Sequence, residues 1–154
     1  MAGSAWERVK GSMAELRALG GASTLLGWDQ ETYMPARGGA ARAEQLAALQ
    51  GVLHERLTDP RLGDAIEAAA AEPRSDAERA ALRALRFDRE RAARVPGDLV
   101  RALALAQSHG VEAWKVARQR GAFAGFAPHL EGLVRLRREM ADAWLPMIRD
   151  GAEV

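Results

Sequence analysis

Three short breaks divide the chain into amphipathic stretches, and they constrain the fold more than any other feature. Asp59 is of a residue type that caps helices, and the following Pro60 suits the first helical position. Ser75 and Glu78 have the spacing of a capping box, in which each side chain accepts a hydrogen bond from the other residue's backbone N–H. Pro96 ends one helical stretch and starts the next. These breaks predict separate helices joined by short connections.

Apolar residues between the breaks recur at intervals of three and four positions, which is the period of an amphipathic helix rather than of a strand. The second predicted helix carries Leu46, Leu49 and Leu53 on one face. Helices are expected over residues 4–26, 39–57, 60–71, 75–94, 96–120 and 128–148. The pattern therefore predicts an all-α fold: one antiparallel, bundle-like domain of five to six helices that takes up residues 1–154.

Composition excludes several classes of function. The chain has no cysteine, which removes disulfides, thiolate metal sites and cysteine nucleophiles. Its 22 basic and 21 acidic residues nearly balance, so no global charge points to nucleic acid or to a membrane surface. The arginine-rich stretch 83–94 includes Asp88 and Glu90, a mixture typical of a solvated helix with i to i+4 ion pairs. Since no signal peptide or membrane-length apolar run occurs, we expect a cytoplasmic protein that binds neither nucleic acid nor membrane.

The stretch GWDQETYMP, residues 27–35, places polar and aromatic residues together between two helical stretches. Its polar residues are Asp29, Gln30, Glu31 and Thr32. Two carboxylates could serve a metal or acid–base chemistry. In the structural alternative, Asp29 or Thr32 caps backbone groups, and the gap between two helices is filled by Trp28, Tyr33 and Met34. Because neither a histidine nor a glycine-rich loop accompanies the carboxylates, the residues favour a corner between two helices.

Several motifs nevertheless match one known family. They include WDQETYMP (28–35), the pair Gly38-Gly39, RAEQLA (42–47), and HE (54–55) followed by TDP (58–60). The match continues in RVPGDLV (94–100), WKVAR (114–118) and FAPHLEGLV (126–134). In these motifs the chain resembles the N-terminal region of the carboxypeptidase Taq (thermostable carboxypeptidase 1) family of zinc metallocarboxypeptidases. The resemblance extends from about residue 25 to residue 140.

The resemblance implies a helical fold, a cleft in which zinc supports the removal of C-terminal residues from peptides, and a homodimer. Members of the family are much longer than this chain, and their zinc motif, HExxH, lies beyond the point at which this sequence stops. In that motif two histidines one helical turn apart bind the zinc ion, and the glutamate acts as a base on the bound water.

The three histidines of the chain do not reproduce that motif. The stretch HERLT (54–58) begins like it, but Thr58 cannot act as the second imidazole ligand, and His54 is expected to be a lone histidine on the surface or half-buried. His109 is expected on a solvent-facing side, and His129 in the first turn of the last helix. No two histidines have the i to i+4 spacing. We therefore predict no catalytic residue, no cofactor-binding residue and no metal ligand in this chain, although the full-length family uses zinc.

Two functions of different classes remain. In the first, the chain is a stand-alone, non-catalytic relative of the peptidase that acts as a binding or interaction module. In the second, it is part of a metallocarboxypeptidase, either a truncated form or a subunit completed by a separate HExxH-bearing chain. The second function needs an exposed apolar patch on which that chain can pack. The polar residues 149–153, expected to follow the last helix, favour the first function.

In a longer enzyme of the family, the rest of the protein would bury the apolar faces of these helices. In this chain another molecule has to bury them. A homodimer is the expected solution, since a two-fold interface requires only one self-complementary surface. The residues expected at this interface lie on the last helix and are Leu133, Leu136, Met140, Trp144 and Ile148. Trp28, Tyr33 and Met34 would then be buried within each protomer, where they would hold the first helix against the second.

Overall fold

The computed structural model describes residues 4–151, with side chains described as far as Pro146. Within this range there are six α-helices and no strand, which confirms the predicted all-α fold. The helices are α1 (Ala5–Thr32), α2 (Gly39–Thr58), α3 (Pro60–Ala70), α4 (Asp76–Ala93), α5 (Gly97–Arg120) and α6 (Ala127–Gly151), with two 3-10 turns, η1 (Ala36–Gly38) and η2 (Phe123–Gly125). No helix in the described range has the length and apolar character needed to cross a membrane.

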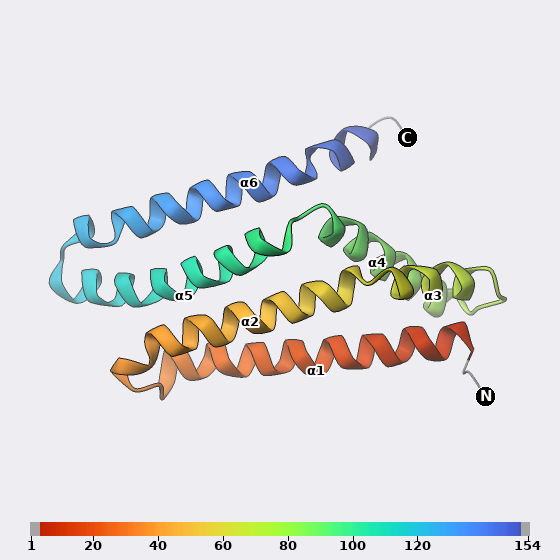
Figure 1. Cartoon of the computed structure of the whole chain (residues 1–154), viewed down its shortest axis with the longest axis horizontal. Helices are drawn as coiled ribbons and strands as arrows, with labels where there is room; N and C mark the ends of the chain where they lie inside the picture. Colours follow the sequence, from red (N-terminus) through yellow and green to blue (C-terminus); the bar gives the residue numbers. More distant parts are fainter. Residues whose placement is uncertain (1–3, 152–154) are drawn as a thin grey trace.

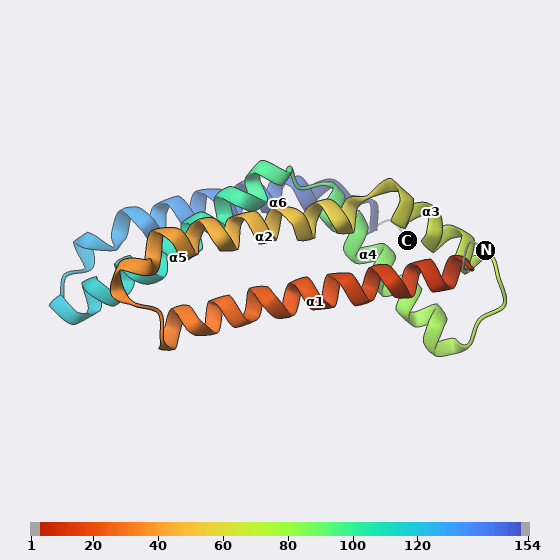
Figure 2. The same cartoon turned by 60° about the horizontal axis from the view of Figure 1, so that its bottom comes forward.

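Four long helices lie along the long axis of the molecule, and the shorter α3 and α4 occupy one end (Figure 1). The central pair is α2 and α5; α1 packs on α2, and α6 packs on α5. Figure 2 shows α1 along the bottom of the view, set apart from the layer that holds α2, α5 and α6. Because consecutive long helices run in opposite directions, the turn between α1 and α2 and the turn between α5 and α6 lie at the same end, away from α3 and α4 (Figure 1).

Small residues let α2 approach its neighbours closely. The buried positions of α2 are Ala43, Ala47 and Gly51, which lie four residues apart on one face. A Cβ atom on Gly51 would stand 2.7 Å from Nη1 of Arg101 on α5, so only glycine fits there without a shift of that side chain. The leucines predicted to form the apolar face of this helix are half-buried instead. Small side chains, more than leucines, therefore define the contact between α2 and α5.

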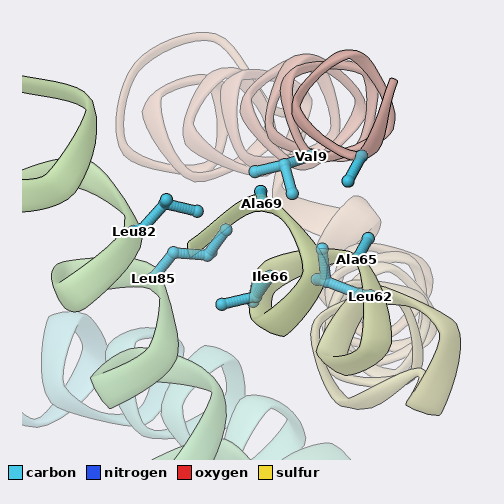
Figure 3. Packing of buried hydrophobic residues seen from close by; sticks show 8 residues of the cluster. Val9, Leu62, Ala65, Ile66, Ala69, Leu82 and Leu85 are labelled. Carbon is cyan, nitrogen blue, oxygen red and sulfur yellow. The ribbon is translucent and has the colours of Figure 1, made fainter. Parts of the chain in front are cut away.

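The main cluster of buried apolar residues lies where α1, α3 and α4 meet. Val9 and Ile66 have the largest side chains that are fully buried. Figure 3 shows Val9 projecting from α1 toward Ala69 of α3, while Leu82 and Leu85 project from α4 toward the same helix. The short α3 therefore holds α1 and α4 together at this end of the molecule.

The predicted caps are present at the breaks. The Asp59 carboxylate accepts a hydrogen bond of 2.9 Å from the backbone N–H of Arg61, and Pro60 is the first residue of α3. The Ser75 hydroxyl accepts from the backbone N–H of Glu78 at 3.3 Å, and the Glu78 carboxylate accepts from the backbone N–H of Ser75 at 3.0 Å. These local signals fix where α3 and α4 begin, as the sequence predicts.

The first helix is longer than predicted. It continues to Thr32 instead of ending near residue 26, so the WDQET part of the signature forms its last turns. Gly20-Gly21 does not end it, because a glycine costs a helix only about 1 kcal/mol, and α1 also packs on α2 and α3. The helix ends where the backbone N–H groups of residues 33 and 34 both donate to the Asp29 carbonyl, at 3.0 and 2.9 Å.

The last helix also extends further than predicted. It includes residues 149–151, which were expected to belong to a polar tail, and it continues through Pro146. Residues 152 and 153 of that tail lie outside the described residues, as does the side chain of Ile148.

Candidate functional site

The polar residues of the signature stretch reach across to other helices. The Asp29 carboxylate lies 2.6 Å from the guanidinium of Arg42 on α2, and the same guanidinium donates to the Leu26 carbonyl. Asp29 therefore does not cap α1 with its side chain, as one reading of the sequence expected, but pairs with α2. The Thr32 hydroxyl donates to the Trp28 carbonyl of its own helix at 2.8 Å. Since Arg42 is the first residue of RAEQLA, this ion pair joins two of the matched motifs.

Gln30 is the buried centre of the stretch, with 6% of its surface exposed, and its partner Ser108 on α5 is 3% exposed. The Gln30 side-chain amide donates to the Ser108 hydroxyl at 2.9 Å and to the Ser108 carbonyl at 3.2 Å. The Ser108 hydroxyl donates in return to the Gln30 side-chain carbonyl at 3.2 Å. Because unpaired polar groups are costly to bury, this two-way bond fixes the end of α1 against α5.

Lys115 brings the remaining carboxylates of the cluster together. Its ammonium group donates to the Gln30 backbone carbonyl at 2.9 Å and lies 3.1 Å from the Glu112 carboxylate and 3.6 Å from the Glu31 carboxylate. Glu112 also accepts from the Gln30 amide at 3.3 Å. Each acidic side chain of the stretch is thus paired with a cation, Asp29 with an arginine and Glu31 with this lysine. The arrangement neutralises the carboxylates and is suited to holding helices together.

The aromatic residues of the stretch are exposed, so the expectation that they are buried between α1 and α2 is wrong. Trp28 is 53% exposed and Tyr33 is 75% exposed, and their rings contact each other with centroids 5.4 Å apart. Met34 is half-buried against η1, where its Cγ atom lies 2.9 Å from the position of a Cβ on Gly38. The last turns of α1 project these rings outward because the opposite face of the helix carries the polar contacts to α2 and α5.

The apolar stripe assigned to a dimer interface faces the interior of the molecule instead. Leu136 is buried, and the Leu133 Cδ1 atom lies 3.1 Å from the position of a Cβ on Gly110 of α5. The Trp144 indole N–H donates to the Arg91 carbonyl at 3.2 Å, and the Arg91 guanidinium lies 4.3 Å from the centroid of the indole ring. These contacts attach α6 to α5 and α4. The exposed large apolar residues of α6 are Leu130, Val134 and Leu145.

The arginines of α4 pair mainly with other helices rather than along their own. Arg86 lies 2.7 Å from the Glu67 carboxylate of α3, and Arg89 donates to backbone carbonyls at the α2–α3 junction. Arg91 contacts the indole of Trp144. The predicted i to i+4 ion pairs are replaced by these contacts because α4 packs on α3 and lies next to α6.

The three histidines fall in two places in the fold. His54 is half-buried on α2, where burial and the Arg101 cation lower its pKa, while Glu55 raises it. At the fifth position of HERLT, the Thr58 hydroxyl donates to the His54 carbonyl at 2.8 Å. His109 and His129 are exposed and line a common groove.

The histidine and acidic side chains that the structure describes are not arranged to bind a zinc ion. No three histidine or acidic side chains in the described range are placed so that they could hold a metal. These residues therefore do not form the zinc site that the family resemblance implies. That the chain itself lacks metal, cofactor and catalytic residues stays a prediction for experiment.

Comparison with known proteins shows which family shares these motifs. The family model for carboxypeptidase Taq (M32) metallopeptidases matches residues 8–150. The chain belongs to this family. Thermostable carboxypeptidase 1 of Thermus thermophilus is 35% identical over 144 residues, an alignment that covers 90% of this chain and 28% of the relative. Thermostable carboxypeptidase 1 of Pyrococcus furiosus is 29% identical over 140 residues, with 88% and 28% covered.

A solved structure agrees with the sequence comparisons. The M32 carboxypeptidase from Deinococcus radiodurans superposes with a TM-score of 0.69 at 32% identity, over 91% of this chain and 28% of the other. The motif-based assignment to the family is therefore confirmed. The chain spans less than a third of the length of the M32 relatives it matches.

Proposed function

We propose that this chain is a helical binding or interaction module of the M32 family that does not itself hydrolyse peptides. The observation that carries the proposal is the pairing within the signature stretch: Asp29 with Arg42, Gln30 with Ser108, and Glu31 with Lys115. Residues that carry the family resemblance are thus used to join α1, α2 and α5. A groove of about 490 Å³ between α1, α2, α5 and α6 gives the module a concave surface for binding.

The second candidate is a part of a metallocarboxypeptidase that a separate HExxH-bearing chain completes, so that the complex removes C-terminal residues from peptides. Exposed apolar residues near the α5–α6 turn favour it: Trp114, Phe123, Leu130 and Val134 are all more than a third exposed. Such side chains are the surface that a further helical part of the fold would cover. The same surface would serve a homodimer, the other proposed partner arrangement.

The test is to measure zinc content and peptidase activity on the purified chain. After dialysis against zinc-free buffer we expect substoichiometric zinc and no release of C-terminal amino acids from a peptide. Stoichiometric zinc together with chelator-sensitive activity would contradict the non-catalytic module. Activity that appears only after addition of an HExxH-bearing chain, and in proportion to it, would favour the second candidate.

A further inference from the structure

A second groove is lined by residues of η1, α2, α5, η2 and α6. The α1–α2 turn and the α5–α6 turn lie at the same end of the molecule (Figure 1). The volume of the groove is about 570 Å³, which falls in the range of small-molecule sites. Arg37 of η1 and Arg120 in the last turn of α5 both line it, as do the imidazoles of His109 and His129. The fold therefore brings together basic and imidazole side chains from η1, α5 and α6.

The two guanidinium groups are not neutralised. Among the side chains that the structure describes, which end at Pro146, the guanidinium groups of Arg37 and Arg120 have no hydrogen-bonding or ion-pair partner. The acidic residue that lines the groove, Glu112, is already paired with Lys115 at 3.1 Å. The groove therefore has an excess of positive charge for which the described part of the chain supplies no counter-charge.

The dipoles of the helices with an end at the groove do not account for its positive potential. α2 and α6 begin at the groove while α5 ends there, so positive and negative ends of helix dipoles lie together and offset each other in part. The arginine side chains consequently make the decisive contribution to the potential.

The rest of the lining is mainly small and apolar. Ala40, Ala113 and Val116 contribute to it, and Val116 is 47% exposed. A hydrated inorganic ion would leave these surfaces in contact with water, whereas an apolar group attached to the ion would cover them.

We propose that this groove binds a small organic anion, with a carboxylate or phosphate head held by Arg37 and Arg120 and an apolar group packed near Ala113 and Val116. Guanidinium groups bind the oxygens of carboxylates and phosphates through parallel N–H donors. An imidazole N–H of a neighbouring histidine can add a further donor. All the residues that line this groove belong to this chain.

The experiment titrates the isotope-labelled full chain with four probes and follows its backbone amide signals by NMR. Benzoate and phenyl phosphate should give saturable shifts at Gly39, Ala40 and His129, which report on the groove. Benzyl alcohol, which lacks the charge, should not, and inorganic phosphate should bind more weakly than phenyl phosphate. The stronger of the two aromatic anions identifies the head group that the groove prefers.

Matched variants test the role of the arginines. Arg37→Gln combined with Arg120→Gln should weaken benzoate or phenyl phosphate binding by about tenfold or more, since a charge-assisted bond is lost at each position. Arg17→Gln is the control, because Arg17 is likewise exposed, has no partner among the side chains described up to Pro146, and does not line the groove. The amide spectrum of each variant also shows whether it is folded.

Three outcomes would overturn the proposal. They are absence of saturable shifts with both aromatic anions, equal shifts with benzyl alcohol, and undiminished binding in a folded double variant. Binding of inorganic phosphate as tight as that of phenyl phosphate would overturn the role of the apolar lining. None of these results depends on zinc content or peptidase activity, so the groove and the non-catalytic module can fail separately.

Discussion

Gln30 of α1 and Ser108 of α5 donate hydrogen bonds to each other while both are buried, across 78 residues of sequence. This pair lies at the centre of the stretch that carries the family resemblance. It explains why a polar residue occurs on the inner face of a helix end whose aromatic residues point outward.

Loss of one partner of this pair should destabilise the fold. Ser108→Ala leaves the Gln30 amide with fewer acceptors in a buried place, so we expect the free energy of unfolding to fall by about 1–3 kcal/mol. Urea unfolding followed by circular dichroism measures it, with the exposed Gln119→Ala as the control. Adding Gln30→Leu to Ser108→Ala should cost less than the sum of the two single changes. Strict additivity would contradict a direct bond between them.

The ion pair between Asp29 and Arg42 should be structural. Arg42 is only 12% exposed at its side chain, so Asp29→Asn removes the counter-charge of a mostly buried cation. A double-mutant cycle with Arg42→Gln should give a coupling energy of about 0.5–3 kcal/mol. If Asp29 were a metal ligand instead, Asp29→Asn would lower zinc content and leave unfolding in metal-free buffer unchanged.

Substitutions on two sides of α6 should have different effects. Trp144→Glu removes an N–H donor and a ring that contacts Arg91, so it should lower the stability of each protomer. Val134→Glu lies on the exposed side and should leave stability nearly unchanged while splitting any homodimer formed through that side. Sedimentation equilibrium combined with thermal unfolding separates the two effects. If the parent protein is a dimer and Trp144→Glu gives a folded monomer of unchanged stability, the side of α6 that carries Trp144 forms the dimer interface.

His54 should make stability depend on pH. Burial and the Arg101 cation lower its pKa below the usual value for histidine, about 6.5, against an opposing contribution from Glu55. His54 therefore binds a proton more readily in the unfolded chain than in the folded one. Its contribution to the free energy of unfolding is fully present above about pH 6.5 and is lost as the pH falls through the folded-state pKa. Between roughly pH 8 and pH 5, the free energy of unfolding should fall less in His54→Gln than in the parent. An equal fall in both proteins would exclude His54 as a source.

Local signals in the sequence predicted the fold well. Asp59, Ser75 and Glu78 act on backbone groups within a few residues, so their roles follow from spacing alone, and the all-α class follows from periodicity. The end of α1 is less predictable, because the packing of α1 on α2 and α3 offsets the cost of Gly20-Gly21 within the helix.

The site was less predictable because its partners are distant in sequence. Nothing near Gln30 indicates that Ser108 will face it, and the role of Lys115 depends on how α5 lies beside α1. The one available signal was that Arg42 and Lys115 both occur in motifs shared with the family. The sequence also does not indicate which side of α6 faces the interior. Apolar residues occur on both sides of this helix, and only packing distinguishes the buried Leu136 from the exposed Leu130 and Val134.

The separation between Gln30 and Ser108 also has a consequence during synthesis. The ribosome must add a further 78 residues after Gln30 before its partner exists. At typical rates of about 5–20 residues per second, this takes several seconds. During that interval the WDQET turns can pair with α2 through Arg42, but they have no place to bury the glutamine. The N-terminal half of the protein is therefore synthesised before Gln30, at the centre of the signature stretch, can form the hydrogen bonds to Ser108 that bury it.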